Sequence, residues 1–196
     1  MKKIIIKLII IIIGFSANLS AEENKIIKRI SEGNENAKIT IIAYESLTCG
    51  HCADFHTNVY PDLKKDFIET GLVKIEFRHF PLDIAAFNAS KISQCNNDGE
   101  SDIMHILYSG QKKWARGKTP EEATGYLKKF LANEGVKVNF EKCLTDKTIE
   151  DYVLNDRIEG AKKFKVNATP TIIINDKKFD KALNYKNLKK YLEKLI

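Results

Sequence analysis

The junction between an apolar run and a pair of cysteines constrains this chain more than any other stretch of its sequence. Residues 39–44 read ITIIAY, a continuous apolar run rich in β-branched side chains, which is typical of a strand buried on both faces. Cys49 and Cys52 follow within TCGHCADFH (48–56), and beyond Gly50 apolar residues recur at near-helical spacing. We therefore expect a strand to turn into a helix at Cys49.

The start of a helix is a favourable place for a thiolate. Unpaired N–H groups and the positive end of the helix macrodipole stabilise negative charge there, so we expect the pKa of Cys49 to be depressed. A protonated His51 would stabilise the thiolate further, whereas Cys52 lies one turn into the helix and is expected to be more buried and less acidic. This asymmetry predicts that Cys49 exchanges disulfides and that Cys52 closes the ring.

Other uses of the cysteine pair fit the sequence less well. An inert disulfide between Cys49 and Cys52 would close a very small loop and contribute little stability. A zinc site that adds His51 and His56 would lack a second ligand pair at the spacing of zinc fingers or ribbons. Haem attachment requires a histidine directly after the second cysteine, where Ala53 stands. We therefore predict no metal and no cofactor.

Residues 1–21, MKKIIIKLIIIIIGFSANLSA, have the outline of an export signal, with lysines, an apolar run and then small or polar residues. The apolar run is short for a membrane span, although the large Leu19 near the expected cleavage site leaves an uncleaved anchor as the alternative. Export predicts a periplasmic, oxidising location. Removing the three lysines of this segment lowers the formal net charge from +6 to +3, and the remaining lysines are scattered, so no nucleic-acid partner is expected.

The export signal also decides how the two remaining cysteines are interpreted. Because Cys49 and Cys52 form the local pair, an oxidising compartment leaves Cys95 to pair with Cys143. This bridge would close a loop of about fifty residues and stabilise the fold by roughly 4 kcal/mol in the chain-entropy model. Two buried free thiols are the alternative.

The first half of the mature chain has the pattern of a βαβ unit, which we assign to residues 22–82. Residues 31–38 read as a polar turn before the first strand, and Pro61 should kink the helix that follows the cysteines. Residues 72–80, LVKIEFRHF, alternate apolar and charged side chains and predict the second strand.

Helical patterns dominate residues 83–163, including a helix that starts at the N-cap Thr119 with a capping box to Glu122. Residues 164–196 return to a buried strand at 171–176 and end in an amphipathic helix. The side chains of that helix expected to face inward are Leu188, Leu192 and Leu195.

A second informative stretch is VNATPTIII (166–174), because a proline directly before a strand is confined to the strand's first position or to an edge. If the Thr169–Pro170 bond is cis, the main chain of Thr169 can pair with an extended substrate beside Cys49. An ordinary trans proline that introduces a strand is the simpler interpretation of this stretch alone.

Together these motifs resemble the thioredoxin superfamily, and specifically DsbA-like thiol oxidoreductases with a helical insertion. The resemblance spans residues 36–196 and is carried by CGHC, FRHFPLD and DRIEGAKKFKVNATPT. It implies an α/β thioredoxin fold with the helical insertion between a βαβ half and a ββα half. It also implies that Cys49 is the nucleophile, Cys52 the resolving cysteine and Pro170 a cis-proline beside them.

Two departures from the DsbA pattern affect the expected chemistry. Gly50-His51 stands where DsbA proteins usually carry Pro-His, and both this pair and Thr169 before the proline are familiar from disulfide isomerases. A less oxidising potential with some isomerase activity follows from that likeness. The buried acid that many relatives carry six residues before the first cysteine is Ala43 here, so proton relay to Cys52 must use Glu45, water or nothing.

The sequence thus predicts a monomeric periplasmic thiol:disulfide oxidoreductase that introduces disulfides into unfolded or reduced exported proteins. The resemblance implies a membrane oxidase as the partner that reoxidises Cys49 and Cys52. The alternatives are a disulfide isomerase or reductase of the same fold and, in a different class, a surface-anchored binding protein without redox turnover.

Overall fold

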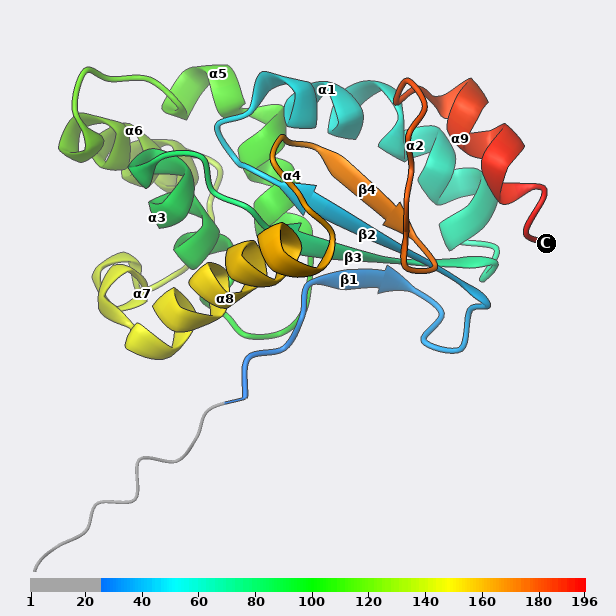
Figure 1. The fold of residues 1–196 in the computed structure, drawn as a ribbon. Coiled ribbons are helices and arrows are strands. Elements are labelled where there is room, and N and C mark those ends of the chain that lie inside the picture. Colours follow the sequence, from blue (N-terminus) through cyan, green and yellow to red (C-terminus); the bar gives the residue numbers. More distant parts are fainter. Residues whose placement is uncertain (1–25) are drawn as a thin grey trace, which may run out of the picture.

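A five-stranded mixed sheet forms the centre of the structure, a computed structural model that describes residues 26–196 (Figure 1). The order of the strands across the sheet is β1-β3-β2-β4-β5. β2 and β3 run parallel, and the other three pairings are antiparallel. The strands are β1 (Ser31–Gly33), β2 (Ile39–Glu45), β3 (Val73–His79), β4 (Thr171–Ile174) and β5 (Lys177–Lys178).

The central strand β2 is buried on both faces, as its sequence predicts. Ile41 and Ala43 join the larger hydrophobic core, which also contains Phe55 from the helix after the cysteines. Tyr44 points to the other side, where it packs in a smaller cluster with Ile173. Because β3 and β4 pair with both edges of β2, the strand also has its backbone hydrogen bonds satisfied by neighbours.

Helices cover both faces of this sheet. α1 (Gly50–Asn58), α2 (Tyr60–Leu63) and α9 (Tyr185–Leu192) lie above it in Figure 1, and α8 (Lys147–Lys163) crosses below. The remaining α-helices gather at one end of the sheet and, together with α8, make up the helical insertion. They are α3 (Ile84–Ser93), α4 (Asp102–Ser109), α5 (Gln111–Trp114), α6 (Pro120–Asn133) and α7 (Phe140–Thr145).

The predicted chain order of a βαβ half, a helical block and a ββα half is confirmed by these elements. The domain boundaries at 22–82, 83–163 and 164–196 stay predictions. The expected export signal, residues 1–21, lies outside the described residues. Within the described part of the chain, no helix combines the length and apolar character that crossing a membrane requires.

The polar stretch 31–38 was predicted as a turn, and this is wrong for its first three residues. Ser31–Gly33 form β1, which pairs antiparallel with β3. The strand is short and its side chains are partly exposed, so no alternation of apolar residues marks it in the sequence. Gly33 has φ of 98°, and a Cβ there would lie 2.4 Å from the carbonyl oxygen of Val73, so the pairing requires a glycine.

The kink predicted at Pro61 is confirmed. The chain passes from α1 into the short α2 and then into a π-helical turn, η1 (Lys64–Ile68). Pro61 has no N–H to donate to the preceding turn, which breaks the hydrogen-bond ladder at this point. Leu63 and Phe67 remain buried across the break, so the three segments still cover one face of the sheet.

Glycine also separates two helices within the insertion. Gly110 lies between α4 and α5, and a Cβ at this position would lie 1.9 Å from the Cζ atom of Phe130 on α6. The ring of Phe130 therefore packs directly on the backbone at the α4–α5 junction. This contact fixes the position of Gln111, the first residue of α5, which reaches the cysteine motif as described below.

Helix caps follow the sequence prediction closely at α6. The Thr119 hydroxyl accepts a hydrogen bond from the Glu122 N–H at 3.2 Å, and Pro120 follows as the first helical residue. The Glu122 carboxylate accepts from the N–H of Lys118 at 2.7 Å, one residue before the position that a standard capping box uses.

The C-terminal helix is shorter than its apolar pattern predicts. Leu188 and Leu192 are fully buried, in agreement with the prediction, but Leu195 is 42% exposed. α9 ends at Leu192, so the helical spacing that would bring Leu195 onto the buried face is lost beyond that residue.

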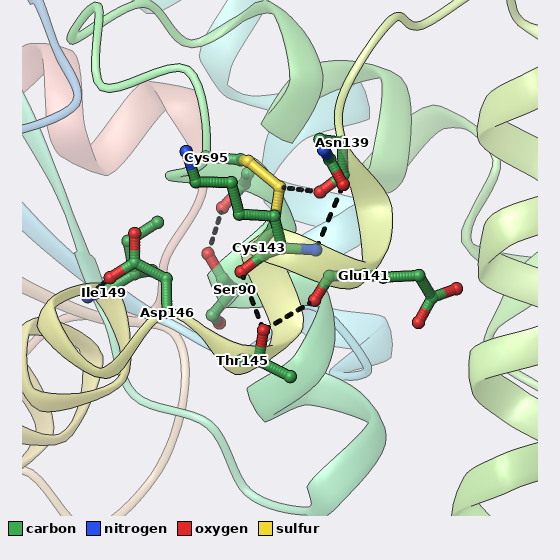
Figure 2. The surroundings of a disulfide bond; sticks show 10 residues. Ser90, Cys95, Asn139, Glu141, Cys143, Thr145, Asp146 and Ile149 are labelled. Carbon is green, nitrogen blue, oxygen red and sulfur yellow. Dashed lines mark hydrogen bonds between the residues drawn. A yellow bond between two sulfur atoms is a disulfide. The ribbon is translucent and has the colours of Figure 1, made fainter.

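A disulfide joins Cys95, just beyond α3, to Cys143 on α7, with the two Cα atoms 5.4 Å apart (Figure 2). α7 is held locally by its own caps, because the Asn139 side chain accepts from the N–H of Lys142 and the Thr145 hydroxyl donates to the carbonyl of Glu141. The bridge thus anchors a six-residue helix to the rest of the insertion.

We predict that the double substitution Cys95→Ala and Cys143→Ala lowers the free energy of unfolding by roughly 4 kcal/mol, because it frees a loop spanning 48 residues in the unfolded chain. Urea unfolding monitored by circular dichroism measures this change. The matched control, Cys49→Ala with Cys52→Ala, retains the bridge. A loss below about 1 kcal/mol in the first variant would contradict the structural role.

Candidate active site

Cys49 is the N-cap of α1, at the point where β2 has ended and the helix begins. Its N–H donates to the carbonyl of Ser46 at 3.0 Å, which forms the tight turn between strand and helix. The side chain of Gln111 donates to the carbonyls of Leu47 at 2.8 Å and of Cys49 at 2.9 Å. The helical insertion therefore supports the turn that presents the first cysteine.

The two cysteines of the motif differ in exposure as predicted. Both are free thiols; Cys49 is partly exposed, whereas Cys52 is completely buried in the main core. The difference follows from helix geometry, because Cys49 lies at the helix terminus and Cys52 lies one turn further, on the face that packs against the sheet. A partner molecule can reach the sulfur of Cys49 and cannot reach that of Cys52.

The pKa of the Cys49 thiol is lowered from 9.0 to about 5. The hydrogen bond from the Cys52 thiol lowers it most, partial burial opposes this, and the Thr169 side chain and the backbone N–H groups of Cys52 and His51 lower it further. Cys49 is therefore largely a thiolate at neutral pH. The pKa is thus lowered in the expected direction, but the largest cause is the Cys52 thiol, and the N–H groups at the helix start add to it.

The Cys52 thiol has the opposite character, because its pKa is raised. Burial is the main cause, and the hydrogen bond that Cys52 donates to Cys49 and the negative charge of Glu45 both add to it. Cys52 consequently stays protonated while Cys49 is ionised. This difference is the one expected between an attacking and a resolving thiol.

His51 contributes differently from the sequence prediction. Its imidazole is 88% exposed and lies 3.9 Å from the Asp54 carboxylate, at the surface of α1. The hydrogen bond from His51 that lowers the pKa of Cys49 comes from its backbone N–H. Gly50 is also unconstrained, since a Cβ at this position would meet no atom within 4 Å. The two residues between the cysteines thus face outward.

The loop before β4 lies directly against the first cysteine. The Thr169–Pro170 peptide bond is cis, and the Cys49 thiol donates to the Thr169 carbonyl at 3.3 Å. The Thr169 hydroxyl is buried and forms no hydrogen bond with any group within residues 26–196. It can donate to the sulfur once Cys49 is ionised, which agrees with its lowering of the Cys49 pKa.

An open groove of about 500 Å³ runs beside the cysteine motif. One wall comes from α1, the other from the start of α9, and the Thr169–Pro170 loop forms the end nearest Cys49. Residues along it include His51, Asp54, Phe55, Thr169, Pro170 and Tyr185. Apolar and polar side chains alternate in this open lining, which suits an extended polypeptide more than a small molecule.

The Cys95–Cys143 disulfide lies in the insertion, away from the two free thiols. Among residues 26–196, no group of three or more His, Cys, Asp or Glu side chains is arranged to hold a metal ion. The structure therefore brings together Cys49, Cys52, Thr169 and Pro170 in one site.

Glu45 and His56 are the polar residues whose environment the sequence did not reveal. Glu45 is the last residue of β2, where the sequence fits a solvated side chain as well as a buried one. In the structure it is buried, with 4% of its surface exposed. Its carboxylate lies 2.9 Å from Nε2 of His56, which α1 carries into the core. The only signal in the sequence is the spacing, because a histidine four residues after Cys52 falls on the same buried face of the helix.

A thiolate at a helix start, a buried second thiol and an adjacent cis-proline loop on this sheet define a dithiol protein with a thioredoxin fold. A family model described as Thioredoxin matches residues 25–194. The chain belongs to this thioredoxin family. Within it, the resemblance to DsbA-like proteins is confirmed by the following solved structure and relatives.

The crystal structure of alpha-DsbA1 from Wolbachia pipientis is 29% identical, has a TM-score of 0.76 and aligns over 87% of this chain and 92% of that chain. Disulfide bond formation protein D of Bacillus subtilis is 26% identical over 171 residues, which is 83% of this chain and 74% of that protein. A Rickettsia bellii relative, named provisionally as a protein-disulfide oxidoreductase, is 27% identical over 82% of this chain. The match covers 61% of the Rickettsia protein's own length.

We predict that Cys52→Ala raises the pKa of Cys49 above about 5, because it removes the hydrogen bond that lowers this pKa most. The pKa should stay below 9.0, since Thr169 and the backbone N–H groups remain. Ultraviolet absorbance of the thiolate, followed against pH, measures the shift. A Cys49→Ala variant provides the baseline, and an unchanged midpoint in Cys52→Ala would show that the hydrogen bond has no such effect.

The lowered pKa of Cys49 also predicts how stability depends on pH. In the reduced protein the folded state binds fewer protons than the unfolded state between about pH 5 and pH 9, so stability rises with pH over this range. The oxidised protein has no ionisable Cys49 thiol. We therefore expect the stability of the reduced protein, relative to the oxidised protein, to fall as the pH is lowered from about 8 to 5.

Denaturant unfolding of both redox forms at these two pH values tests this expectation. Titratable groups that both redox forms share contribute equally to the two stabilities and cancel in the comparison. The pH-dependent difference in stability that remains comes from the cysteine motif. A relative stability that does not change with pH would contradict the assignment of a stabilised thiolate.

Proposed function

We propose that this protein is a periplasmic thiol:disulfide oxidoreductase that introduces disulfide bonds into exported proteins through Cys49 and Cys52. The observation that carries the proposal is the contrast between the two thiols, one partly exposed with a pKa of about 5 and the other buried with a raised pKa. An inert disulfide or a binding module has no need of this contrast.

The exchange proceeds in two balanced steps. A substrate thiolate attacks the sulfur of Cys49 in the Cys49–Cys52 disulfide, the S–S bond breaks, and Cys52 leaves as a thiolate that takes up a proton. A second substrate thiolate then attacks the substrate sulfur of the mixed disulfide, and Cys49 leaves as a stabilised thiolate. Two electrons pass from the substrate to the protein, and the substrate gains a disulfide.

The direction of exchange follows from the stability of the leaving group. A thiol of low pKa is a good leaving group, and stabilising its thiolate stabilises the reduced protein relative to its disulfide form. A protein with this property accepts electrons readily and so oxidises its substrates. The pKa of about 5 for Cys49 therefore favours the oxidase role over the reductase role.

Thr169 and Pro170 are proposed to bind the substrate beside Cys49. The main chain of Thr169 lies against the Cys49 sulfur, and the groove continues from there between α1 and α9. An extended polypeptide in this groove can form backbone hydrogen bonds while its cysteine reaches Cys49. The exposed His51 and Gly50 lie at the rim that such a substrate would contact.

The cellular setting of this proposal comes from the export signal expected at 1–21. In the periplasm the substrates would be unfolded or reduced exported proteins, the protein would act as a monomer, and a membrane oxidase would reoxidise the two cysteines. The name of the relative Disulfide bond formation protein D supports a role in disulfide formation, whereas these partners are proposed from the sequence alone. No nucleic acid is expected among them.

A disulfide isomerase is the second candidate, favoured by Gly50-His51 and by Thr169 before the cis-proline. A reductase of the same fold would require a less stabilised Cys49 thiolate. A surface-anchored binding protein without redox turnover is disfavoured, because it would not require an ionised Cys49 beside a protonated Cys52.

We predict that the purified protein oxidises a reduced, unfolded substrate and that Cys49→Ser abolishes this activity, because serine oxygen forms no exchangeable disulfide. Thiol titration of the substrate measures the rate. Cys95→Ala with Cys143→Ala is the matched control and should retain exchange. Normal activity of Cys49→Ser would reject the mechanism.

The same preparation separates the candidate activities. An oxidase forms disulfides in the reduced substrate, whereas an isomerase recovers activity from a substrate whose disulfides are scrambled. The reduction potential of the Cys49–Cys52 pair decides between oxidase and reductase, because a strongly reducing potential would contradict the oxidase role.

A further inference from the structure

A second open groove lies beside Cys49, on the side away from the groove described above. It has a volume of about 590 Å³, and its lining includes Thr48, the residue directly before Cys49. The two grooves share no lining residue, because the first begins at His51 and at the Thr169–Pro170 loop. α3 and α6, which contribute to the second groove, lie across the start of α1 from α9 (Figure 1). A polypeptide that passes Cys49 along the first groove therefore continues toward the second.

A hydrogen bond fixes the wall of the second groove to the cysteine motif. The Thr48 hydroxyl donates to one carboxylate oxygen of Asp83 at 2.7 Å. The other oxygen of Asp83, the N-cap of α3, accepts from the N–H of Ala86 at 2.7 Å. The start of α3 is thereby tied to the residue before Cys49, so the groove keeps a fixed place beside the reactive sulfur.

The second groove presents an unusually exposed apolar side chain. Ile84, the first residue of α3, lines the groove and is 58% exposed, and Leu82, two residues earlier, is 53% exposed. Among the large hydrophobic side chains of residues 26–196, only Ile26 and Ile196, at the two ends of this range, are more exposed than Ile84. Exposed apolar side chains that lie together beside polar ones are typical of binding surfaces.

Two cations line the same groove from the loop between α5 and α6. They are Arg116 and Lys118, and neither side chain forms an ion pair with a carboxylate within the described part of the chain. The guanidinium carbon of Arg116 lies 4.3 Å from the centroid of the Tyr126 ring. Gly117 between them has φ of 122°, and a Cβ there would lie 2.9 Å from the backbone nitrogen of Ala123, so the loop packs closely on α6.

The two grooves differ in charge. Besides its two cations, the second groove contains the carboxylate of Asp83, which already accepts two hydrogen bonds. The nearby Glu122 carboxylate accepts from the backbone N–H of Lys118 at 2.7 Å. The first groove contains Asp54 and no lysine or arginine. Negative charge on a bound polypeptide is therefore favoured on the side of the second groove.

We propose that the second groove binds the part of a substrate polypeptide on one side of its reactive cysteine and selects substrates with an apolar residue and acidic residues there. The apolar residue packs on Ile84, and the carboxylates pair with Arg116 and Lys118. The part on the other side of the cysteine occupies the first groove. The second groove thus contributes to the choice of which substrate cysteine reacts with Cys49.

This inference rests on the proposed exchange through Cys49 and Cys52 and names the class of substrate for that reaction. Exposed ion pairs are individually weak, so the groove adds selectivity without holding the substrate tightly. Weak binding suits a protein that has to release each substrate after oxidising it.

Oxidation of matched peptides tests the proposal. Each short synthetic peptide carries two cysteines, so that exchange with the oxidised protein runs to completion. A leucine and two glutamates stand either before the first cysteine or after the second, and reference peptides carry glutamine in place of glutamate. Acid quenching and mass spectrometry measure the rate of oxidation. In one of the two placements we expect the glutamate peptide to react about fivefold faster than its glutamine counterpart, as two exposed ion pairs allow.

Charge reversal in the groove, by Arg116→Glu with Lys118→Glu, should abolish the advantage of glutamate over glutamine. The matched control, Lys177→Glu with Lys178→Glu, reverses two exposed charges on β5 outside both grooves and should retain this advantage. Each rate is divided by the rate of the same variant with dithiothreitol. Because this reagent is uncharged and too small to extend from Cys49 into the groove, any change at Cys49 itself cancels.

The apolar part of the groove is tested separately. Ile84→Ser should remove the advantage of a peptide with leucine over one with serine at the same position, because the leucine loses the side chain on which it packs. Ile84 is exposed at the surface of α3, so this variant should fold normally.

The outcomes separate this inference from the proposed function. Equal rates for glutamate and glutamine peptides in both placements, or an advantage that survives the charge reversal, would show that the groove does not select substrates in this way. A dimer in sedimentation that the charge reversal dissociates, with no preference among peptides, would assign the groove to a second copy of the chain. If the unmodified protein oxidises none of the peptides, the proposed function itself fails.

Discussion

The close contact between one sulfur and the elements that stabilise its negative charge is the interaction on which this site depends. Cys49 receives a hydrogen bond from Cys52, faces the N–H groups at the start of α1 and touches the Thr169–Pro170 loop. These groups come from segments about 120 residues apart in the chain. The fold is needed to bring them together, because no local segment contains all of them.

The sheet supplies the rigid support for this contact. β2 and β4 are antiparallel neighbours, so the end of β2 that leads to Cys49 lies beside the start of β4, where Pro170 precedes the strand. Apolar side chains of β2 fill both layers of the core and leave little freedom for the two loops to separate. Burial of ITIIAY and the reactivity of Cys49 are therefore parts of the same arrangement.

Local patterns in the sequence predicted most of the fold and the main site residues. Patterns that act over only a few residues could be recognised in the sequence. They include the apolar run of β2, the alternation in β3, the proline at 61 and the helix cap at Thr119. β1 and the end of α9 were missed because their limits depend on pairing with β3 and on where the packing surface stops. The Glu45–His56 contact was unpredictable for the same reason, since it joins a strand end to a helix face across the core.

The two hydrogen bonds from Gln111 have a consequence for how such a protein can diversify. They hold the carbonyls of Leu47 and Cys49 from α5, which starts beside the contact between Gly110 and Phe130 and lies far from the CGHC motif in the sequence. A substitution in the insertion can thus alter the alignment of the α1 amides with the sulfur. The reduction potential of such a protein can therefore change through substitutions in the helical insertion while the residues of the CGHC motif stay the same.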